Sequence, residues 1–294
     1  MALSVARLVG GLCVLLTAAA CSADGPADEP IVDDSEENLT FRNTPTAGTN
    51  LRDGELVLTF DDGPAASSAN VAALLQERGH VGLFFAVSKH LGRVSNGRVI
   101  LDDAGVAKLE AVVSKGQLVA NHTHDHCIQS PGGAAPCSGL AFSNLPASDM
   151  KSQVEWTDVL LRAALARSNR SGAYLPFFRA PGNSWSASAA RTLSTAALPT
   201  NAYGPISWDL PRSGDEDFRC WSKGESVQTC ADRYIAAWNA MPSGSQKGVV
   251  LIHDNFANAT ELLRRILDGI VGRRTKAGSV ARVVRPGCIV GCTR

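Results

Sequence analysis

The sequence predicts an α/β protein built around a parallel sheet. Short apolar runs of strand character alternate with longer segments that carry apolar residues at helical spacing. One run, Gly248-Val249-Val250-Leu251-Ile252, is continuously apolar, as in an inner strand that is covered on both faces. About 40 residues at the start have a non-globular composition, and the remainder has the length of a barrel-type domain of about 250 residues.

The first expected element is a buried strand at 55–60, followed by the turn Gly63-Pro64. A serine cap, either Ser67 or Ser68, begins the next helix, and Gly79 ends it. The remaining elements alternate in the same way. We expect strands at 81–87, 117–122, 176–179, 201–209, 248–253 and 281–284, and helices at 103–115, 147–167, 186–197, 231–241 and 259–271.

Two adjacent acids, Asp61 and Asp62, come at the end of the first strand. A carboxylate pair is therefore held at the carboxyl end of a strand, which is where active sites lie on α/β barrels. If the motif stood alone, a solvated Asp-Asp-Gly-Pro turn would be the better interpretation. A second group of polar residues accompanies it, however.

That second group is Asn121-His122-Thr123-His124-Asp125-His126, which follows another apolar run and holds three of the six histidines of the chain. The i, i+4 spacing of His122 and His126 directs two imidazoles toward one centre if the backbone curls after the strand. Together with one Asp, these residues predict a site with two histidines and one carboxylate. Such a site holds a catalytic Zn²⁺ or a similar divalent ion and leaves positions open for water.

Four ordered motifs resemble those of the polysaccharide deacetylases, which form carbohydrate esterase family 4 and are also called NodB-homology domains. The resemblance covers roughly residues 51–255, and it implies a distorted (β/α)7 barrel of parallel strands with the helices outside. The motifs are Thr59 to Pro64, His122-Thr123-x-x-His126, Arg179-Ala180-Pro181-Gly182 and Leu251-Ile252-His253.

The resemblance implies that Asp62, His122 and His126 bind the metal, for which we expect zinc, with cobalt, nickel and manganese as alternatives. It also implies that Asp61 is the general base and that Arg179 holds it in place. The chemistry agrees, because a metal that lowers the pKa of bound water toward about 7 supplies the nucleophile that amide hydrolysis requires. A carboxylate that stays off the metal then takes the proton of that water.

By the same resemblance, a backbone N–H near Gly182 helps to bind the oxyanion and Leu251 lines the pocket for the acetyl methyl group. His253 is the expected general acid, since the departing amine needs a proton and a histidine can supply one at neutral pH. The third motif departs from the family, because Pro181 is followed directly by Gly182 where a bulky residue usually intervenes.

The fourth family motif, two acids followed by a tryptophan, is not cleanly present in this chain. We assign Asp209 as the carboxylate that orients His253, because it ends the strand expected at 201–209. Asp215 and Asp217 are the alternatives, and both are equally compatible with a solvated loop.

We predict a hydrolase that removes N-acetyl groups from a polysaccharide containing N-acetylglucosamine, either chitin-like or peptidoglycan. Trp185 and Trp221 are expected to line the cleft, because an aromatic face suits the apolar side of a sugar ring. The alternatives are an O-acetyl esterase acting on xylan and a catalytically inactive glycan-binding protein of the cell envelope. The chain carries 28 basic and 28 acidic residues, so its charge does not indicate a nucleic-acid partner. We expect a monomer.

The N-terminus predicts export. Residues 1–21 resemble a signal peptide, and Thr17-Ala18-Ala19-Ala20-Cys21 resembles a bacterial lipoprotein box in which Cys21 is lipidated. Residues 22–50 are acidic and polar, as in a disordered linker, and 51–294 form the catalytic domain. The protein is thus expected to be a cell-envelope lipoprotein or a secreted or periplasmic protein, in contact with the membrane only through its lipid anchor.

Six of the eight cysteines lie beyond the N-terminal segment. Six cysteines allow 15 pairings. Proximity in the sequence favours Cys127 with Cys137, Cys220 with Cys230 and Cys288 with Cys292, which agrees with an oxidising compartment. A structural zinc site is the alternative, but the paired Cys-x-x-Cys spacing is missing from the sequence.

Overall fold

The computed structural model describes residues 41–130 and 136–292. The predicted signal peptide, the lipidation site Cys21 and the linker as far as residue 40 lie outside the described residues.

The predicted end of the linker at residue 50 is wrong, because residues 41–50 pack against the folded part of the chain. Phe41 is only 8% exposed, and its ring contacts that of Phe178. The backbone N–H of Thr46 donates to the carbonyl of Pro205. Composition alone could not show these contacts, because they are made with segments more than 130 residues away.

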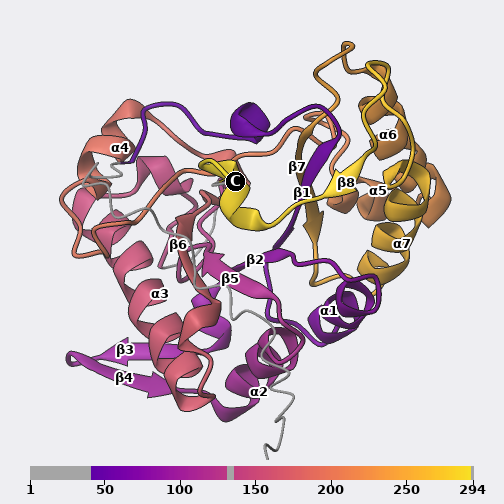
Figure 1. Ribbon diagram of the computed structural model, residues 1–294. Coiled ribbons are helices and arrows are strands. Elements are labelled where there is room, and N and C mark those ends of the chain that lie inside the picture. Colours follow the sequence, from indigo (N-terminus) through magenta and orange to yellow (C-terminus); the bar gives the residue numbers. More distant parts are fainter. Residues whose placement is uncertain (1–40, 131–135, 293–294) are drawn as a thin grey trace, which may run out of the picture. The chain divides into compact units, whose positions relative to one another are not determined.

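A parallel sheet lies at the centre of the fold, as predicted (Figure 1). Its strands are β1 (Glu55–Asp61), β2 (Leu83–Ala86), β5 (Leu118–Asn121), β6 (Tyr174–Phe178), β7 (Gly248–His253) and β8 (Arg282–Val283). The hydrogen-bonded order is β6-β5-β2-β1-β7, with β8 also paired to β1, and every pair is parallel. All seven residues of β1 are buried, because strands cover both of its edges and side chains cover both of its faces.

Residues 203–210 close the ring of strands between β6 and β7. Phe177 pairs with Tyr203 and Leu210 pairs with Val250, both through parallel bridges. The strand predicted at 201–209 is therefore present only as isolated bridges. Pro205 interrupts it, because proline has no N–H to donate to a ladder. With this segment added to the six-stranded sheet, the predicted distorted barrel of seven parallel strands is confirmed.

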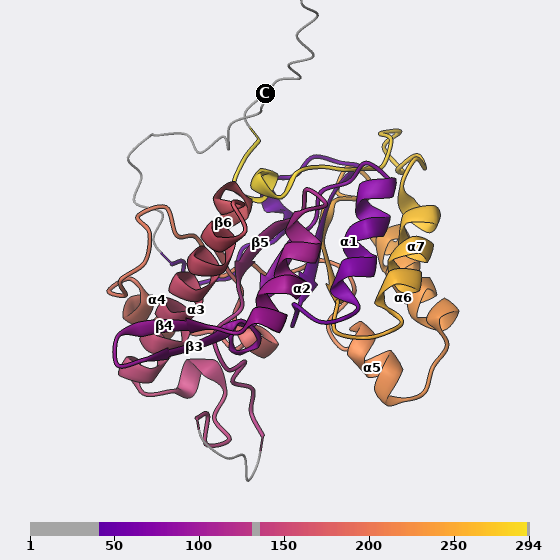
Figure 2. The same ribbon diagram turned by 90° about the horizontal axis from the view of Figure 1, so that it is seen from below.

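Helices surround the strands on the outside (Figures 1 and 2). Five of those predicted are present, and the helix expected after the first strand is also found. They are α1 (Ser68–Glu77), α2 (Asp103–Val113), α3 (Ala147–Arg167), α4 (Ala187–Leu193), α6 (Val227–Ala240) and α7 (Ala259–Ile270). Short 3-10 helices span Gly48–Asn50, Ser88–His90, Phe142–Asn144, Ser171–Ala173, Pro181–Asn183 and Pro286–Ile289.

A capping side chain explains the start of α2 but not the start of α1. The Asp102 carboxylate accepts the backbone N–H of Gly105 and so caps α2. Ser67 occupies the N-cap position of α1, but its hydroxyl donates to the carbonyl of Asp254 instead of capping the helix. This contact ties the start of α1 to the loop that follows β7.

Neighbouring residues of β1 face two different parts of the core, as strand geometry requires. Phe60 packs with Val71 and other apolar side chains of the surrounding helices. Val57 packs in a second cluster with Tyr203 of the closing segment, on the inner side of the barrel. Asp61 lies four residues after Val57 and therefore on the same face of the strand, so its side chain is directed toward the inside of the barrel.

Two elements were not predicted. A hairpin of β3 (Gly92–Ser95) and β4 (Arg98–Leu101) lies beside α3 (Figure 1). Its turn is Asn96-Gly97, in which both residues have positive φ, and this pair is a strong hairpin signal in the sequence. The second element is the six-residue helix α5 (Asp217–Ser222).

The three predicted disulfides, Cys127–Cys137, Cys220–Cys230 and Cys288–Cys292, are all present. Three disulfides are typical of a protein that folds in an extracellular, oxidising environment. Within residues 41–130 and 136–292, none of the helices combines the length and the apolar content that crossing a membrane requires.

Candidate active site

Four inner strand ends bring their polar side chains to one place. Inner-facing side chains recur every second residue along a strand, and Ala120, Phe177 and Val249 belong to the inner apolar cluster. Two or four residues further along the same strands come His122, Arg179 and His253. Because the strands are parallel and in register, with Asp61 opposite His253, these side chains meet at the carboxyl end of the barrel.

Asp62 joins Asp61 at the site because the backbone turns sharply after β1. Successive side chains of a strand face opposite sides, so a regular strand would have separated the two acids. Asp62 instead has a φ of 77°, in the left-handed region that is unusual for a residue with a side chain. Backbone strain of this kind is concentrated at functional sites.

The loop after β5 curls in the same way and brings two histidines together. Thr123 and His126 both have positive φ, and the backbone N–H of His126 donates to the Thr123 hydroxyl. The Asn121 side chain, in turn, accepts the N–H of Thr123. As a result, the ring centroids of His122 and His126 lie 4.9 Å apart.

Asp62, His122 and His126 form a donor set that fits a divalent metal ion. One ligand atom from each residue lies within 4.8 Å of the other two. The Nδ1–H of His122 donates to the carbonyl of Arg179 at 2.8 Å, which leaves its Nε2 free to face Asp62. This tautomer, fixed by a backbone carbonyl behind the ring, is typical of a metal-binding histidine.

A buried oxygen supports the same conclusion. Oδ1 of Asp62 is inaccessible to solvent and has no hydrogen-bond partner among the described residues. It lies 3.1 Å from Nε2 of His126 and 3.5 Å from Nε2 of His122. A buried carboxylate oxygen is costly without a partner, and a cation held between these three atoms would provide one.

The charges of two of the three donors, Asp62 and His126, agree with metal binding. Burial alone would raise the pKa of Asp62, but the contact with His122 and the charges of His126 and His253 hold it well below its usual range. Burial, reinforced by the neighbouring His122, lowers the pKa of His126 to about 4. At neutral pH, Asp62 is therefore ionised and His126 is neutral, which are the protonation states that metal ligands need.

Asp61 is buried beside this donor set and is held by Arg179. One guanidinium nitrogen of Arg179 donates to Oδ1 of Asp61 at 2.7 Å and to the Thr59 hydroxyl at 2.8 Å. The other two nitrogens donate to the carbonyls of Ile206 and Ser207 in the closing segment. Oδ1 of Asp61 is thereby occupied, and Oδ2 is directed toward the histidines, 3.5 Å from Nε2 of His122.

The carboxylate that orients His253 is Asp217, so the assignment of Asp209 is wrong. Asp217 is fully buried and accepts the Nδ1–H of His253 at 2.6 Å and its backbone N–H at 2.9 Å. Burial disfavours the charged imidazolium, but Asp217 outweighs this effect and raises the pKa of His253 to about 9. His253 therefore carries at neutral pH the proton that a general acid donates.

Asp209 has a different structural role. Its Oδ2 accepts the backbone N–H groups of Gly48 and Val249, near the beginning of β7 and away from His253. Asp215, the other alternative, lies 3.9 Å from Arg233. Asp217 had a signal in the sequence, because Phe218 follows it where the family motif has an acid followed by tryptophan.

A cavity of about 560 Å³ opens over these groups. Gly182, which has a φ of 58°, and Leu251 both line it. The aromatic prediction is wrong, since neither Trp185 nor Trp221 is among the lining residues. The residues that line the cavity are Asp61, Asp62, His122, His126, Ile128, Ala180, Gly182, Asn183, Trp208, Ser213, Glu216, Phe218, Arg219, Leu251, His253 and Phe256.

The two predicted tryptophans are held elsewhere by packing. Trp185 contacts the rings of Phe41 and Phe178, and its indole N–H donates to the carbonyl of Arg42. Trp221 packs against the outer apolar cluster. The aromatic walls of the cavity are instead Trp208, Phe218 and Phe256, and the latter two place their rings edge-on to His253.

Comparisons with known proteins identify relatives of this chain. The chain is 25% identical over 233 residues to a chitin disaccharide deacetylase from Vibrio alginolyticus. That match covers 74% of this chain and 46% of the relative, so the chain spans about half the length of the curated relative it matches.

Two solved structures show the same fold at low sequence identity. One is a chitin deacetylase from Colletotrichum lindemuthianum, with a TM-score of 0.57 and 21% identity over 85% of this chain and 93% of the other. The second is a pseudoenzyme of carbohydrate esterase family 4 from Bacillus anthracis, with a TM-score of 0.54 and 15% identity over 78% and 64% of the two chains. The fold is therefore shared by active and inactive members.

The sequence model of the polysaccharide deacetylases matches residues 48–200, which is just over half of the 294 residues and includes the donor set, Asp61 and Arg179. The chain belongs to the polysaccharide deacetylase family.

Proposed function

We propose that this protein is a metal-dependent deacetylase that hydrolyses N-acetyl groups of a glycan containing N-acetylglucosamine, either chitin-like or peptidoglycan. The observation that carries the proposal is the placement of two proton-transfer groups in one cavity with the metal donor set. Asp61 is held by Arg179, and His253 is held by Asp217. Family membership and the chitin-deacetylase relatives support the substrate class.

In the proposed site, Asp62, His122 and His126 hold the metal. We propose Zn²⁺, and the same donors also suit Co²⁺, Ni²⁺ or Mn²⁺. When bound, the metal would polarise the acetyl carbonyl and lower the pKa of a water molecule. The remaining steps belong to the side chains of the protein.

Oδ2 of Asp61 is the proposed acceptor of the proton of the attacking water, since Oδ1 is engaged by Arg179. The backbone at Gly182 is the proposed donor to the oxyanion, and Leu251 is the proposed contact of the acetyl methyl group. As the C–N bond breaks, Nε2 of His253 would give its proton to the departing nitrogen. Asp217 would keep Nδ1–H in place and stabilise the imidazolium beforehand.

A glycan-binding protein without turnover is the second candidate, because the family includes a pseudoenzyme of this fold. The chain argues for the enzyme, since it retains a base, an acid and three metal donors together. A protein that only binds a glycan needs neither of the two oriented proton-transfer pairs.

The test is acetate release from N-acetylglucosamine oligomers, peptidoglycan and acetylated xylan by the wild type with added Zn²⁺ or Co²⁺. The matched variant is Asp61→Asn, which should bind the metal but lose about 100-fold or more of its activity, as removal of a general base predicts. Release from xylan alone would make the protein an O-acetyl esterase. Metal bound in both proteins with no release from any substrate would favour the binding role.

We also propose export and anchoring through a lipid on Cys21, supported by the lipoprotein-like box in the sequence and by the three disulfides. Mass spectrometry of the mature N-terminus, with Cys21→Ala as the control, tests this. A diacylated cysteine at the N-terminus is expected, and an unmodified N-terminus near residue 21 would show simple secretion.

A further inference from the structure

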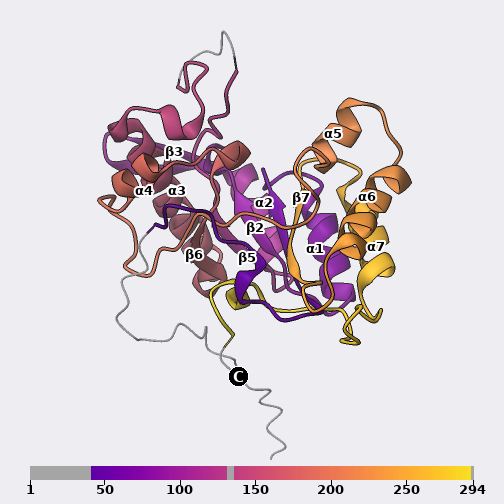
Figure 3. The same ribbon diagram turned by 90° about the horizontal axis from the view of Figure 1, so that it is seen from above.

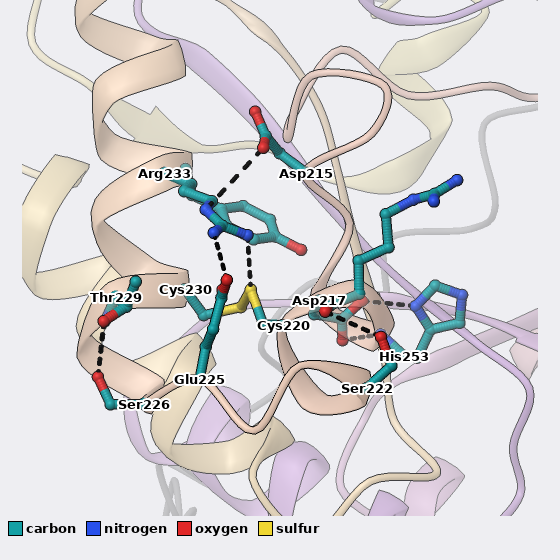
Figure 4. Close-up of a disulfide and its surroundings, with 12 residues drawn as sticks. Asp215, Asp217, Cys220, Ser222, Glu225, Ser226, Thr229, Cys230, Arg233 and His253 are labelled. Atoms are coloured by element: carbon teal, nitrogen blue, oxygen red, sulfur yellow. Dashed lines mark hydrogen bonds and ion pairs between the residues drawn. A yellow bond between two sulfur atoms is a disulfide. The ribbon is translucent and has the colours of Figure 1, made fainter.

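The helix α5 decides where the partner of His253 lies. Asp217 is its first residue, and its carboxylate holds both the ring and the backbone of His253 (Figure 4). A small shift of α5 would therefore lengthen two hydrogen bonds to the proposed general acid at once.

α5 is too short to hold itself in place. It has six residues, and isolated helices shorter than about 12 residues are marginal in water. Its stability must come from tertiary contacts. Figures 1 and 3 place it beside α6, which packs against it.

A disulfide and the side chain of Arg233 join α5 and its flanks to α6. The disulfide links Cys220 of α5 to Cys230 of α6, and both residues are completely buried. Arg233, one turn further along α6, donates to Sγ of Cys220 at 3.4 Å and pairs with Glu225 at 2.7 Å (Figure 4). It also lies 3.9 Å from Asp215, so its charge faces residues both before and after α5.

The same face of α6 also holds β7. The hydroxyl of Tyr234, four residues after Cys230, donates to the carbonyl of Leu251 at 2.8 Å, and both residues are buried. Leu251 lies two residues before His253. The helix α6 thus fixes both members of the pair. It holds Asp217 through the disulfide to α5, and it holds His253 through the hydrogen bond to β7.

We propose that Cys220, Cys230 and Arg233 form a clamp that positions Asp217 against His253 and so sets how efficiently His253 protonates the leaving nitrogen. This inference rests on the proposed deacetylase function. Cys220 and Cys230 are positioning residues, and so is Arg233, because none of them lines the cavity. Since both sulfur atoms belong to fully buried residues, reductants cannot reach them in the folded protein, and the clamp is a permanent device rather than a redox switch.

The clamp should matter only for a leaving group that needs a proton. When an amide is cleaved, the C–N bond breaks, its electron pair goes to nitrogen, and nitrogen takes the proton of His253 Nε2. 4-Nitrophenyl acetate releases a stable phenolate that requires no proton. A misplaced His253 should therefore slow amide cleavage and leave aryl-ester cleavage nearly unchanged.

The experiment compares the metal-loaded full chain with the variant Cys220→Ala/Cys230→Ala on N-acetylglucosamine oligomers and on 4-nitrophenyl acetate. The expected result is a fall in kcat for the oligomers of roughly ten- to a hundredfold, within the range assigned to general acids. KM for the oligomers and kcat for the ester should change by less than about threefold, because metal and cavity are retained.

The matched control is Cys127→Ala/Cys137→Ala, since this disulfide also joins residues ten positions apart. This disulfide lies next to His126, so its removal should change kcat for both substrates in the same proportion. Should the Cys220→Ala/Cys230→Ala protein not fold, Arg233→Gln keeps the disulfide and should reduce amide turnover selectively by about threefold or more, with partial recovery in Arg233→Lys.

A second readout does not depend on catalysis. The Nδ1–H of His253, in a 2.6 Å hydrogen bond to Asp217, should give a downfield proton NMR signal that is absent in His253→Gln. The Cys220→Ala/Cys230→Ala variant should lose or broaden this signal. An unchanged signal with an unchanged ratio of amide to ester activity would overturn the inference. If the wild type releases no acetate but the variant still loses the signal, the proposed function fails and the clamp stands.

Discussion

Replacement of Asp217 by asparagine is the sharpest test of the electrostatics of the site. An asparagine side chain at this position would have nearly the same shape but no charge, and its single oxygen could accept only one of the two N–H groups that Asp217 accepts. The wild-type carboxylate is buried and lies 2.6 Å from His253. The substitution therefore removes the main interaction that keeps His253 protonated, with little change in packing.

The structure sets the size of the effect. Burial disfavours the charged form of His253, but Asp217, with smaller contributions from Asp62 and Asp61, raises its pKa from 6.5 to about 9. At about 1.4 kcal/mol for each pH unit, this difference corresponds to about 3 kcal/mol of stabilisation, of which Asp217 is the largest source. Because the folded pKa is raised, the stabilisation is fully present below pH 6.5 and is lost as the pH rises through 9.

The assay is thermal unfolding of wild type and Asp217→Asn at several pH values between about 6 and 10, with a chelator present so that bound metal adds no stability. For a domain of this size, about 3 kcal/mol corresponds to a difference in Tm of roughly 6–12 °C. We expect a difference of at least that order near the acidic end of this range and a smaller one near the alkaline end, where only the loss of one hydrogen bond remains.

The control is Asp209→Asn, because Asp209 accepts two backbone N–H groups and does not contact His253. Its difference from the wild type should not depend on pH across this range. If the difference for Asp217→Asn is as large at the alkaline end as at the acidic end, the charge interaction with His253 is not its cause and the reasoning fails.

Three further predictions concern the metal, the buried ion pair and a close helix contact. His126→Ala should weaken Zn²⁺ binding by more than about 100-fold, since even changes to residues that only support the ligands reduce metal affinity by about 10- to 100-fold. An unchanged Kd in a calorimetric titration would contradict the donor set. Arg179→Met leaves the buried Asp61 without its cation and should lower the free energy of unfolding, measured by urea denaturation, by about 3–5 kcal/mol. A loss below about 1 kcal/mol would show that other groups stabilise Asp61. Gly105→Ala should lower the free energy of unfolding by about 2 kcal/mol, because the alanine β-carbon would overlap the carbonyl oxygen of His90. This loss should outweigh the higher helix propensity of alanine. A raised Tm would show that the contact relaxes freely.

The family assignment and the site geometry support different conclusions. Family membership follows from the sequence match, but the fold alone does not separate enzymes from pseudoenzymes, since it is shared with an inactive relative. The case for turnover therefore depends on the oriented pairs Asp61–Arg179 and Asp217–His253. Arg179→Met and Asp217→Asn each break one of these two pairs.

Much of the site could be predicted from the sequence because strand geometry is local. Inner-facing residues recur with a period of two, so the inward direction of Asp61 and His253 follows once their strands are recognised. The spacing of His122 and His126 and the three cysteine pairs are also short-range features. The structure contains the strands, the curled histidine loop and all three disulfides.

The tertiary structure alone decided which groups meet across long stretches of sequence. Asp217 and His253 are 36 residues apart, and in the local pattern only the aromatic residue after Asp217 distinguishes it from Asp209 and Asp215. Trp185 lost its predicted place in the cavity because Phe41, from the distant N-terminal segment, packs against it. Local periodicity determines which way a side chain points, whereas its partner depends on how distant segments pack, and that information is spread over the whole chain.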